Sequence, residues 1–202
     1  MNKRLVILGD GGHAKSVIDV ALATGEYEIS AVLGLDSKNA SHWNAKGIDW
    51  IHENSAQEAL RHSTLAIVGL GQISDPAPRE SAFLKLQNLG FELATIVSPF
   101  AYLSNSAVVG QGSIVMHGAI VSIDSRVGEN TIVNSMALLE HESSVGSHSH
   151  VSTGAILNGN CTVGHRTFIG SGTVVRQGIR IGSDCVIPMG SQVVADLTDG
   201  HR

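Results

Sequence analysis

The sequence predicts an α/β, Rossmann-like half-domain over residues 1–96, followed by an all-β parallel β-helix built from hexapeptide repeats over residues 97–202. Three observations support this prediction. A glycine-containing turn follows the first apolar run, an aliphatic residue recurs at every sixth position from Val97 onward, and a glycine recurs every eighteen residues within that stretch. The first feature is typical of nucleotide-binding α/β folds, and the other two are typical of a solenoid.

The six-residue period runs from Val97 to Val193, and all seventeen of its positions are aliphatic. The residue two positions earlier is small in fourteen of fifteen cases from Ala107 onward, with Ile179 as the exception. Three hexads make eighteen residues, so we expect each coil to be a triangle of three short strands whose corners lie on small residues or on glycines that tolerate positive φ. The glycines that repeat with the period of eighteen are Gly110, Gly128, Gly146, Gly164 and Gly182. A flat run of alternating strands would instead show a period of two.

The first 96 residues alternate between apolar runs and helical patterns. The expected strands are residues 4–8, 29–35, 65–68 and 91–95, with a further short strand after an irregular stretch within 43–51. The expected helices are residues 16–23, 55–62 and 79–89. Ser55 and Glu58 have the spacing of a capping box, and Gly90 is expected to end the third helix. This is about half of a dinucleotide-binding fold, so we expect a mononucleotide or nucleotide-sugar pocket.

The turn after the first strand carries the motif that points to a ligand. Gly9, Gly11 and Ala14 satisfy the pattern G-x-G-x-x-G/A, and Asp36 follows the second strand near the position of a ribose-binding acid. Backbone N–H groups at the start of a helix form a site for any phosphate, so the motif alone does not specify the cofactor. Gly69 ends the strand 65–68, at the edge of a parallel sheet where ligands gather.

Composition excludes several classes of partner and compartment. The net charge of −5 argues against a nucleic-acid surface. Cys161 and Cys185 are expected on different faces of the prism, so no disulfide is predicted. We interpret both as packing residues of a protein in a reducing compartment. No apolar stretch approaches the roughly 20 residues that span a bilayer. We therefore expect a cytoplasmic protein with no membrane partner.

The repeat carries one cluster of chemistry-bearing residues, Glu140-His141-Glu142. His141 should point out of a corner, with Gly159 one coil further on, so that a base and an uncovered N–H lie roughly 5 Å apart. That arrangement suits acyl transfer. Glu142 is the better candidate to orient the imidazole, and Glu140 remains open. The alternatives are a solvated corner histidine and a metal site across a subunit seam, for which His148, His150 and His165 show no tight ligand motif.

These motifs resemble those of a known family. The turn from Gly9 to Lys15, the strand end Leu35-Asp36, the junction Ser98-Pro99 and the block from Asn134 to Val151 are similar to bacterial sugar acyltransferases of the sialic acid O-acetyltransferase type. That group includes the N-acetyltransferases that act on UDP-linked 4-amino sugars in surface glycan biosynthesis. The segment from Gly71 to Pro78 is longer and richer in proline than the matching loop of the family.

The resemblance implies a left-handed β-helix, a homotrimer with active sites at subunit interfaces, and acetyl-CoA as co-substrate without a metal. It also implies direct attack by a UDP-linked amino sugar, with His141 as general base and Glu142 as its support. Residues expected to contact acetyl-CoA or its carbonyl are Gly159 and His150. Residues expected to contact the nucleotide sugar are Gly11, Gly12, His13, Asp36, Gly69 and Asn134.

Four other functions stay open at this point. The same chemistry on a hydroxyl of a sialic acid or a related nonulosonic acid is the alternative within the family. An NAD-dependent oxidoreductase is favoured only by the glycine turn, and the half-size domain argues against it. A β-helix hydratase with interfacial zinc would need a bound metal. A purely structural solenoid leaves the fused nucleotide-type domain unexplained.

Overall fold

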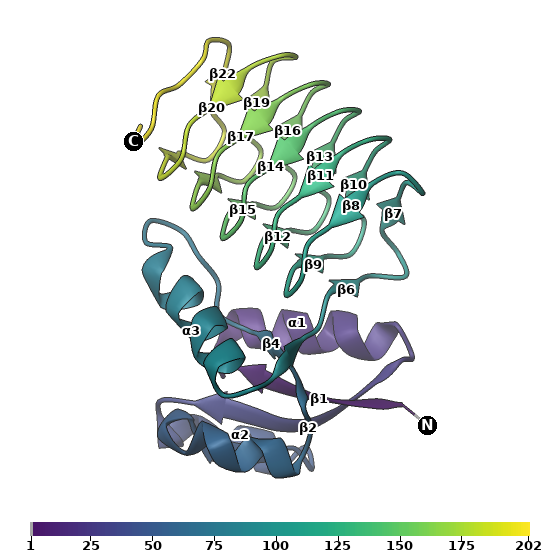
Figure 1. The fold of residues 1–202 in the computed structure, drawn as a ribbon, viewed down its shortest axis with the longest axis vertical. Helices are drawn as coiled ribbons and strands as arrows, with labels where there is room; N and C mark the ends of the chain where they lie inside the picture. The colour runs from purple at the N-terminus through teal and green to yellow at the C-terminus, as the bar shows by residue number, and fades with distance from the viewer. Residues whose placement is uncertain (1) are drawn as a thin grey trace. The chain divides into compact units, whose positions relative to one another are not determined.

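The computed structural model describes residues 2–202. The chain divides into two compact units (Figure 1). The first unit comprises the residues up to Gly71 together with Ala77–Ala94. The second comprises Gln72–Pro76 and Thr95–Arg202. The short segment 72–76 therefore groups with the solenoid although it lies within the sequence of the first unit.

The first unit is built on a parallel sheet of five strands in the order β3-β2-β1-β4-β5. Its strands are β1 (Lys3–Leu8), β2 (Tyr27–Gly34), β3 (Asp49–His52), β4 (Leu65–Val68) and β5 (Glu92–Leu93). The central strands read as continuous apolar runs because helices cover both faces of such a sheet. The short strand expected within 43–51 is β3, which pairs with the edge of β2. The arrangement is that of a Rossmann-like half-domain, as predicted.

Three α-helices and two 3-10 helices complete this unit. They are α1 (Gly12–Ala23), η1 (Ser37–Asn39), α2 (Ala40–Asn44), η2 (Glu53–Arg61) and α3 (Ala77–Asn88). Gly90 follows α3 with φ of 91°, as expected of a helix-ending glycine. The predicted capping box is wrong: η2 begins at Glu53, and among the described residues neither the Ser55 hydroxyl nor the Glu58 carboxylate makes a hydrogen bond. The imidazole of His52 instead accepts a hydrogen bond from the Asn54 N–H at 3.2 Å.

The second unit is a left-handed parallel β-helix of three sheets, with strands of two residues each (Figure 1). Sheet I contains β6 (Ile96–Val97), β9 (Ile114–Val115), β12 (Ile132–Val133), β15 (His150–Val151), β18 (Phe168–Ile169) and β21 (Val186–Ile187). Sheet II contains β7 (Tyr102–Leu103), β10 (Ile120–Val121), β13 (Leu138–Leu139), β16 (Ile156–Leu157), β19 (Val174–Val175) and β22 (Gln192–Val193). Sheet III contains β8 (Val108–Val109), β11 (Arg126–Val127), β14 (Ser144–Val145), β17 (Thr162–Val163) and β20 (Arg180–Ile181).

The hexad period corresponds to the second residue of every strand, which points into the prism. Residues eighteen apart pair directly, as in Val127 with Val145, so the predicted stacking is confirmed. The small residues two positions earlier are also inside, and their hydroxyl groups bond to backbone carbonyls fifteen residues further on. Ser125 donates to Glu140 O at 2.9 Å, and Ser143 donates to Asn158 O at 3.1 Å. These bonds satisfy buried polar groups within an aliphatic core.

The glycines that repeat every eighteen residues are required for a different reason from the one predicted. None of them has positive φ; a Cβ on Gly146 would come within 2.7 Å of the Gly164 backbone in the next coil, so close coil-to-coil approach requires glycine. Positive φ occurs instead three residues after each inward aliphatic residue from Val109 to Ile187. Non-glycine residues with φ of 49° to 60° hold many of these positions, namely Asp124, Asn130, Met136, Glu142, His148, Asn160, Arg166 and Asp184.

Candidate active site

The turn between β13 and β14 presents His141 together with its two acidic neighbours. The Glu142 carboxylate accepts a hydrogen bond from the Nδ1–H of His141 at 3.1 Å. The Glu140 carboxylate accepts one from the backbone N–H of His141 at 3.2 Å, so it does not contact the ring in this arrangement. Within residues 2–202, Nε2 of His141 has no hydrogen-bond partner. The imidazole is therefore oriented by Glu142, and the lone pair of its Nε2 is available to accept a proton.

The coil above leaves room for this imidazole because residue 159 is a glycine. A Cβ placed on Gly159 would collide with Cε1 and Nε2 of His141, so the ring lies directly over the glycine. The carbonyl of Gly159 accepts from Gly178 N at 3.0 Å, whereas its own N–H makes no hydrogen bond within the described residues. An unpaired N–H next to a base can receive negative charge that develops on a carbonyl oxygen.

Glu142 reaches the ring from a left-handed backbone position with φ of 59°. Such a conformation is unfavourable for a glutamate, by about 1–2 kcal/mol relative to the right-handed region. It is held by the coil pattern, in which the Glu142 N–H donates to Ile123 O at 3.0 Å and Asn160 N donates to His141 O at 2.8 Å. The repeat itself therefore sets the direction of the Glu142 side chain.

Asn134 and His150 form a second, separate cluster on the β-helix. Asn134 accepts from Ser135 N at 2.8 Å through Oδ1, so its Nδ2 is the atom that donates to Nε2 of His150 at 3.0 Å. Nδ1–H of His150 consequently donates to the carbonyl oxygen of Gln72 at 2.6 Å. His150 is 6% exposed and packs edge-on against Phe168. Its imidazole is thus buried in the neutral Nδ1–H form and holds the segment 72–76 on sheet I.

The predicted glycine turn in the first unit is open at the start of α1. Gly11 is the N-cap residue, and no side chain caps the helix. Nothing lies within 4 Å of a Cβ built on Gly11 or Gly12. The Asp10 carboxylate accepts from the Trp50 indole N–H at 3.1 Å, which ties the turn to β3. The N–H groups at this helix start are accessible to an anionic ligand.

Gly69 and His13 lie beside this turn, whereas Asp36 lies at the carboxyl end of β2. A Cβ on Gly9 would collide with the backbone of Gly69, so the turns after β1 and β4 approach each other closely. Asp36 caps η1 by accepting from Lys38 N at 3.0 Å and pairs with Lys38 Nζ at 2.6 Å. Its hydrogen bonds with Lys38 lower the pKa of the Asp36 carboxyl. Asp36 is therefore ionised and engaged by Lys38 in this structure.

Comparisons with known proteins match both units of the chain. The family model described as the PglD N-terminal domain matches residues 4–86. Over 115 residues the chain is 30% identical to the UDP-N-acetylbacillosamine N-acetyltransferase of Bacillus subtilis (strain 168), covering 56% of this chain and 51% of that protein. The chain thus spans about half the length of the curated relative it matches.

Solved structures match nearly the whole chain. A histidine-to-asparagine mutant of perosamine N-acetyltransferase from Caulobacter crescentus, in complex with CoA and GDP-perosamine, has a TM-score of 0.88 at 32% identity, covering 96% of this chain and 90% of that chain. The chain belongs to the bacterial sugar acetyltransferase family. The acetyltransferase domain of PglB from Neisseria gonorrhoeae FA1090, in complex with acetyl coenzyme A, gives a TM-score of 0.87 at 31% identity, covering 99% and 95% of the two chains.

The sequence of this sugar acetyltransferase family member does not predict the roles of two residues, Arg79 and Gln72. Arg79 is fully buried and donates to Val68 O at 3.0 Å and Leu70 O at 2.6 Å, so it fixes the carbonyls on both sides of Gly69. Burial lowers the pKa of Arg79 to about 9. Gln72 holds His150 through its backbone carbonyl. An arginine next to Pro78 is a weak signal, and a backbone acceptor leaves no signal in the sequence.

Cys161 and Cys185 are both free and buried, in agreement with the prediction. No group of three His, Cys, Asp or Glu side chains is placed to ligate a metal within residues 2–202. Every helix in the same residues is too short or too polar to cross a bilayer.

Proposed function

We propose that the protein transfers the acetyl group of acetyl-CoA to the amino group of a nucleotide-linked 4-amino sugar, with His141 as general base. The observation that carries the proposal is the His141 imidazole, which has Nδ1 bound to Glu142, Nε2 unpaired and the Gly159 N–H beside it. UDP is the expected nucleotide from the sequence resemblance. GDP is the competing one, because the perosamine enzyme complexed with GDP-perosamine matches nearly the whole chain.

The chemistry follows from the position of these groups. The sugar nitrogen attacks the thioester carbonyl carbon, and Nε2 of His141 takes the proton that the nitrogen loses. The Gly159 N–H stabilises the oxyanion until the C–S bond breaks and CoA leaves as a thiolate. Glu142 stabilises the imidazolium that forms. This is direct transfer, with no acyl-enzyme.

For the nucleotide, we propose contacts from Gly11, Gly12, His13, Asp36 and Gly69, which makes residues 1–96 the nucleotide-sugar-binding domain and residues 97–202 the acyltransferase domain. The uncapped start of α1 suits a diphosphate, because backbone N–H groups and the helix dipole both favour negative charge. The open space at Gly11 and Gly12 allows close approach of the phosphates.

We also propose that the active enzyme is a homotrimer whose active sites lie between subunits. His141 lies in the turn between sheets II and III, whereas Asn134 and His150 lie on the opposite side of sheet II, at the other corner and on sheet I. If Asn134 contacts substrate and His150 lies near acetyl-CoA, they can join His141 in one site only when a second copy supplies one of the two groups.

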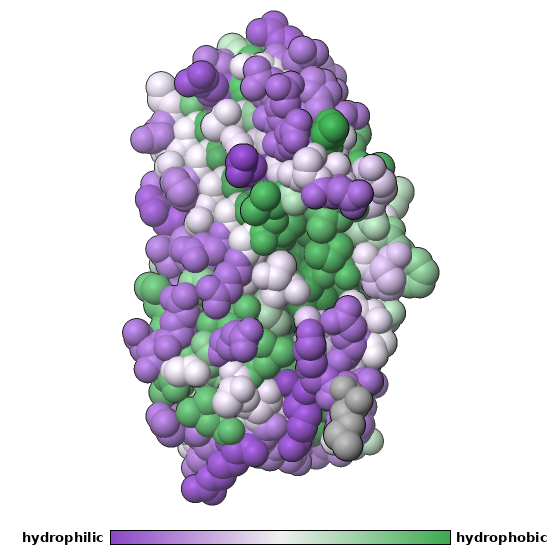
Figure 2. All heavy atoms as spheres, turned by 45° about the vertical axis from the view of Figure 1, so that its right-hand side comes forward, coloured by the Kyte–Doolittle hydropathy of each residue, from purple (hydrophilic) through white to green (hydrophobic). Residues whose placement is uncertain are grey.

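The outer face of sheet II supports such an interface. Its outward positions from β7 to β19 are apolar along the whole column, and three of them, Tyr102, Ile120 and Val174, are more than a third exposed. Figure 2, turned so that the side with β7, β10 and β13 in Figure 1 comes forward, shows apolar side chains gathered on this side. Exposed apolar patches of this kind mark protein interfaces. Ile120→Glu/Val174→Glu should shift the molar mass measured by light scattering from trimer to monomer.

Thiol release from acetyl-CoA tests the function directly. The substrates compared are UDP-linked 4-amino sugars, GDP-perosamine, free sialic acid and CMP-linked sialic acid. Turnover with an amino sugar supports N-acetylation and identifies the nucleotide. Turnover confined to a sialic acid would replace the proposal by O-acetylation, which the same base and N–H could serve. No turnover with any of them would contradict the proposed function.

His141→Ala tests the base on the substrate found in this way. Loss of a general base should lower kcat by about 10²- to 10⁴-fold. Because His141 is exposed on a turn, binding of CoA by calorimetry and the melting temperature should remain those of the unmodified protein. A kcat within twofold of the unmodified protein would remove His141 from the mechanism.

A further inference from the structure

A cavity of about 430 Å³ lies in the first unit, between α1 and the segment that contains α2. Lys15, Ile18, Asp19 and Leu22 line it from α1, one helical face at spacings of three and four residues. His42, Trp43, Lys46 and Ile48 line the other side. The proposed nucleotide contacts are absent from this lining. The volume is within the range of small-molecule sites, about 300–1,000 Å³.

The floor of this cavity is apolar. Ile18 is 7% exposed and Trp43 is 2% exposed, so both are anchored in the fold and present a fixed surface. His42 packs edge-on against Trp43, with ring centroids 4.9 Å apart. The wall continues through Ile48. A planar apolar group would therefore find a rigid surface of matching character.

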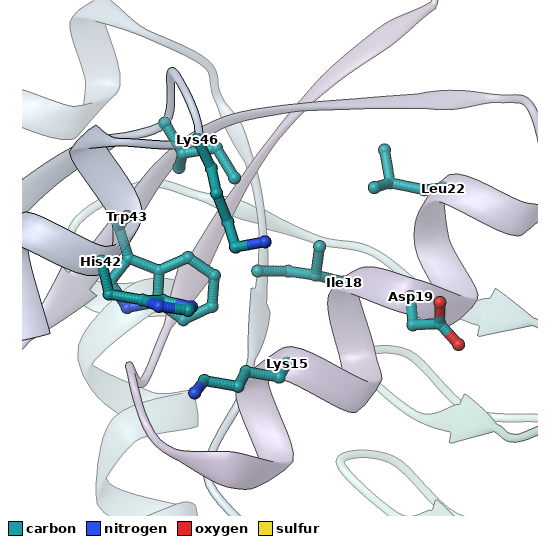
Figure 3. A pocket seen from close by; sticks show the side chains of 8 residues that line it. Lys15, Ile18, Asp19, Leu22, His42, Trp43 and Lys46 are labelled. Atoms are coloured by element: carbon teal, nitrogen blue, oxygen red, sulfur yellow. The ribbon is translucent and has the colours of Figure 1, made fainter.

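Two cations flank this floor. Lys15 and Lys46 are exposed, and neither forms an ion pair or side-chain hydrogen bond within the described residues. Figure 3 shows Lys15 reaching from α1 and Lys46 from the segment beyond α2, on either side of the Trp43 and His42 rings, while the Asp19 carboxylate lies further along α1.

Two positively charged side chains, Lys15 and Lys46, lie near His42 in this cavity. Desolvation lowers the pKa of His42, and the positive charges of Lys15 and Lys46 lower it further. Both ammonium groups therefore lie close enough to the imidazole to act on it. In a chain with a net charge of −5, this is a local exception. A bound anion would offset the positive charges of Lys15 and Lys46.

We propose that this cavity is a binding site for a small organic anion with a planar apolar ring. The ring packs against Ile18 and Trp43, and the anionic group lies between Lys15 and Lys46. Charge alone would favour any anion, and the apolar floor alone would favour any ring. The combination selects a ligand that carries both, such as an aryl phosphate or an aryl carboxylate. The proposal is independent of the acetyltransferase reaction.

The indole N–H signals of the ¹⁵N-labelled protein test the proposal, because the chain has only two tryptophans. Trp43 reports on the cavity, and Trp50, bonded to Asp10, reports on the glycine turn. Trp50→Phe assigns the two signals. The probes are phenyl phosphate, inorganic phosphate and benzyl alcohol. Phenyl phosphate should shift the Trp43 signal saturably, with a Kd at least tenfold below that of either other probe, and saturating GDP should leave this binding unchanged.

Lys15→Ala/Lys46→Ala should raise the Kd for phenyl phosphate at least tenfold. The matched control is Lys3→Ala/Lys85→Ala, which removes two positive charges from other faces of the same unit and should leave the Kd within twofold. Lys15→Gln/Lys46→Gln replaces the first variant if its indole spectrum shows unfolding. An unchanged Kd in both cavity variants, equal binding of benzyl alcohol or inorganic phosphate, a shift of Trp50 alone, displacement by GDP, or no shift at all would each overturn the proposal.

Discussion

Replacing Gly159 by alanine should separate turnover from stability. All three atoms nearest to the added Cβ belong to the His141 ring. The His141 side chain is 46% exposed, so the ring can rotate away while the backbone of the coil stays in place. A displacement of about 1 Å in a catalytic group lowers the rate by about 10²-fold. We therefore expect kcat to fall at least about 100-fold, equivalent to about 2.7 kcal/mol of transition-state stabilisation.

The assay compares thiol release and thermal unfolding for Gly159→Ala and Gly146→Ala. The second variant places its Cβ 2.7 Å from the backbone of Gly164 and His165, atoms that cannot move aside. Overpacking of this kind costs about 1–3 kcal/mol. Gly146→Ala should thus lower the melting temperature and leave the kcat of the folded protein unchanged. Gly159→Ala should lower kcat and leave the melting temperature unchanged. A Gly159→Ala protein with the kcat of the unmodified enzyme would refute the argument that the glycine positions the base.

Three further predictions concern Glu142, His150 and Asp184. Glu142→Gln should lower kcat about tenfold or more because the imidazolium loses its counter-charge, whereas Glu140→Gln, which can still accept from the His141 N–H, should change it less than twofold; steady-state kinetics compares the two. His150→Phe should lower the free energy of unfolding in urea by about 1–3 kcal/mol, because Gln72 O and Asn134 Nδ2 lose their shared partner, and no loss would show that water replaces it. Arg166 lowers the pKa of Asp184 through two hydrogen bonds of 2.7 Å. The ion pair therefore adds stability at neutral pH that disappears as the pH falls through the lowered pKa. Asp184→Asn should lower the free energy of unfolding by about 0.5 kcal/mol at neutral pH and leave it unchanged in acid. An equal loss of stability at both pH values would refute the linkage.

The β-helix could be predicted from the sequence because one residue type repeats at one spacing. Every sixth residue from Val97 to Val193 is aliphatic, and each lies at the second residue of a strand. The sequence also shows the glycine that recurs every eighteen residues, but it does not show why glycine is required there. Sequence spacing does not distinguish a glycine needed for positive φ from one needed for close backbone approach, as at Gly146.

The pairing of His141 with Gly159 followed from the eighteen-residue column, so this part of the candidate site was accessible to sequence reasoning. The choice between Glu140 and Glu142 was not, since it depends on the backbone direction at each residue. Only Glu142 has positive φ, and its carboxylate is the one that contacts Nδ1. The bond from His150 to Gln72 was inaccessible for another reason: it joins residues 78 positions apart through a main-chain oxygen.

The left-handed corner positions of this solenoid hold side chains of several kinds. Their backbone conformation is imposed by the coils on either side, so glutamate, methionine, histidine and arginine all occur where glycine would be easiest. The pair Ile123-Asp124 and the pair Gly159-Asn160 occupy the same two places as His141-Glu142, one coil earlier and one coil later. A protein designer could therefore transplant the histidine and glutamate by one coil, together with the glycine that follows above them, and move the reactive group along the prism axis in steps of about 4.8 Å.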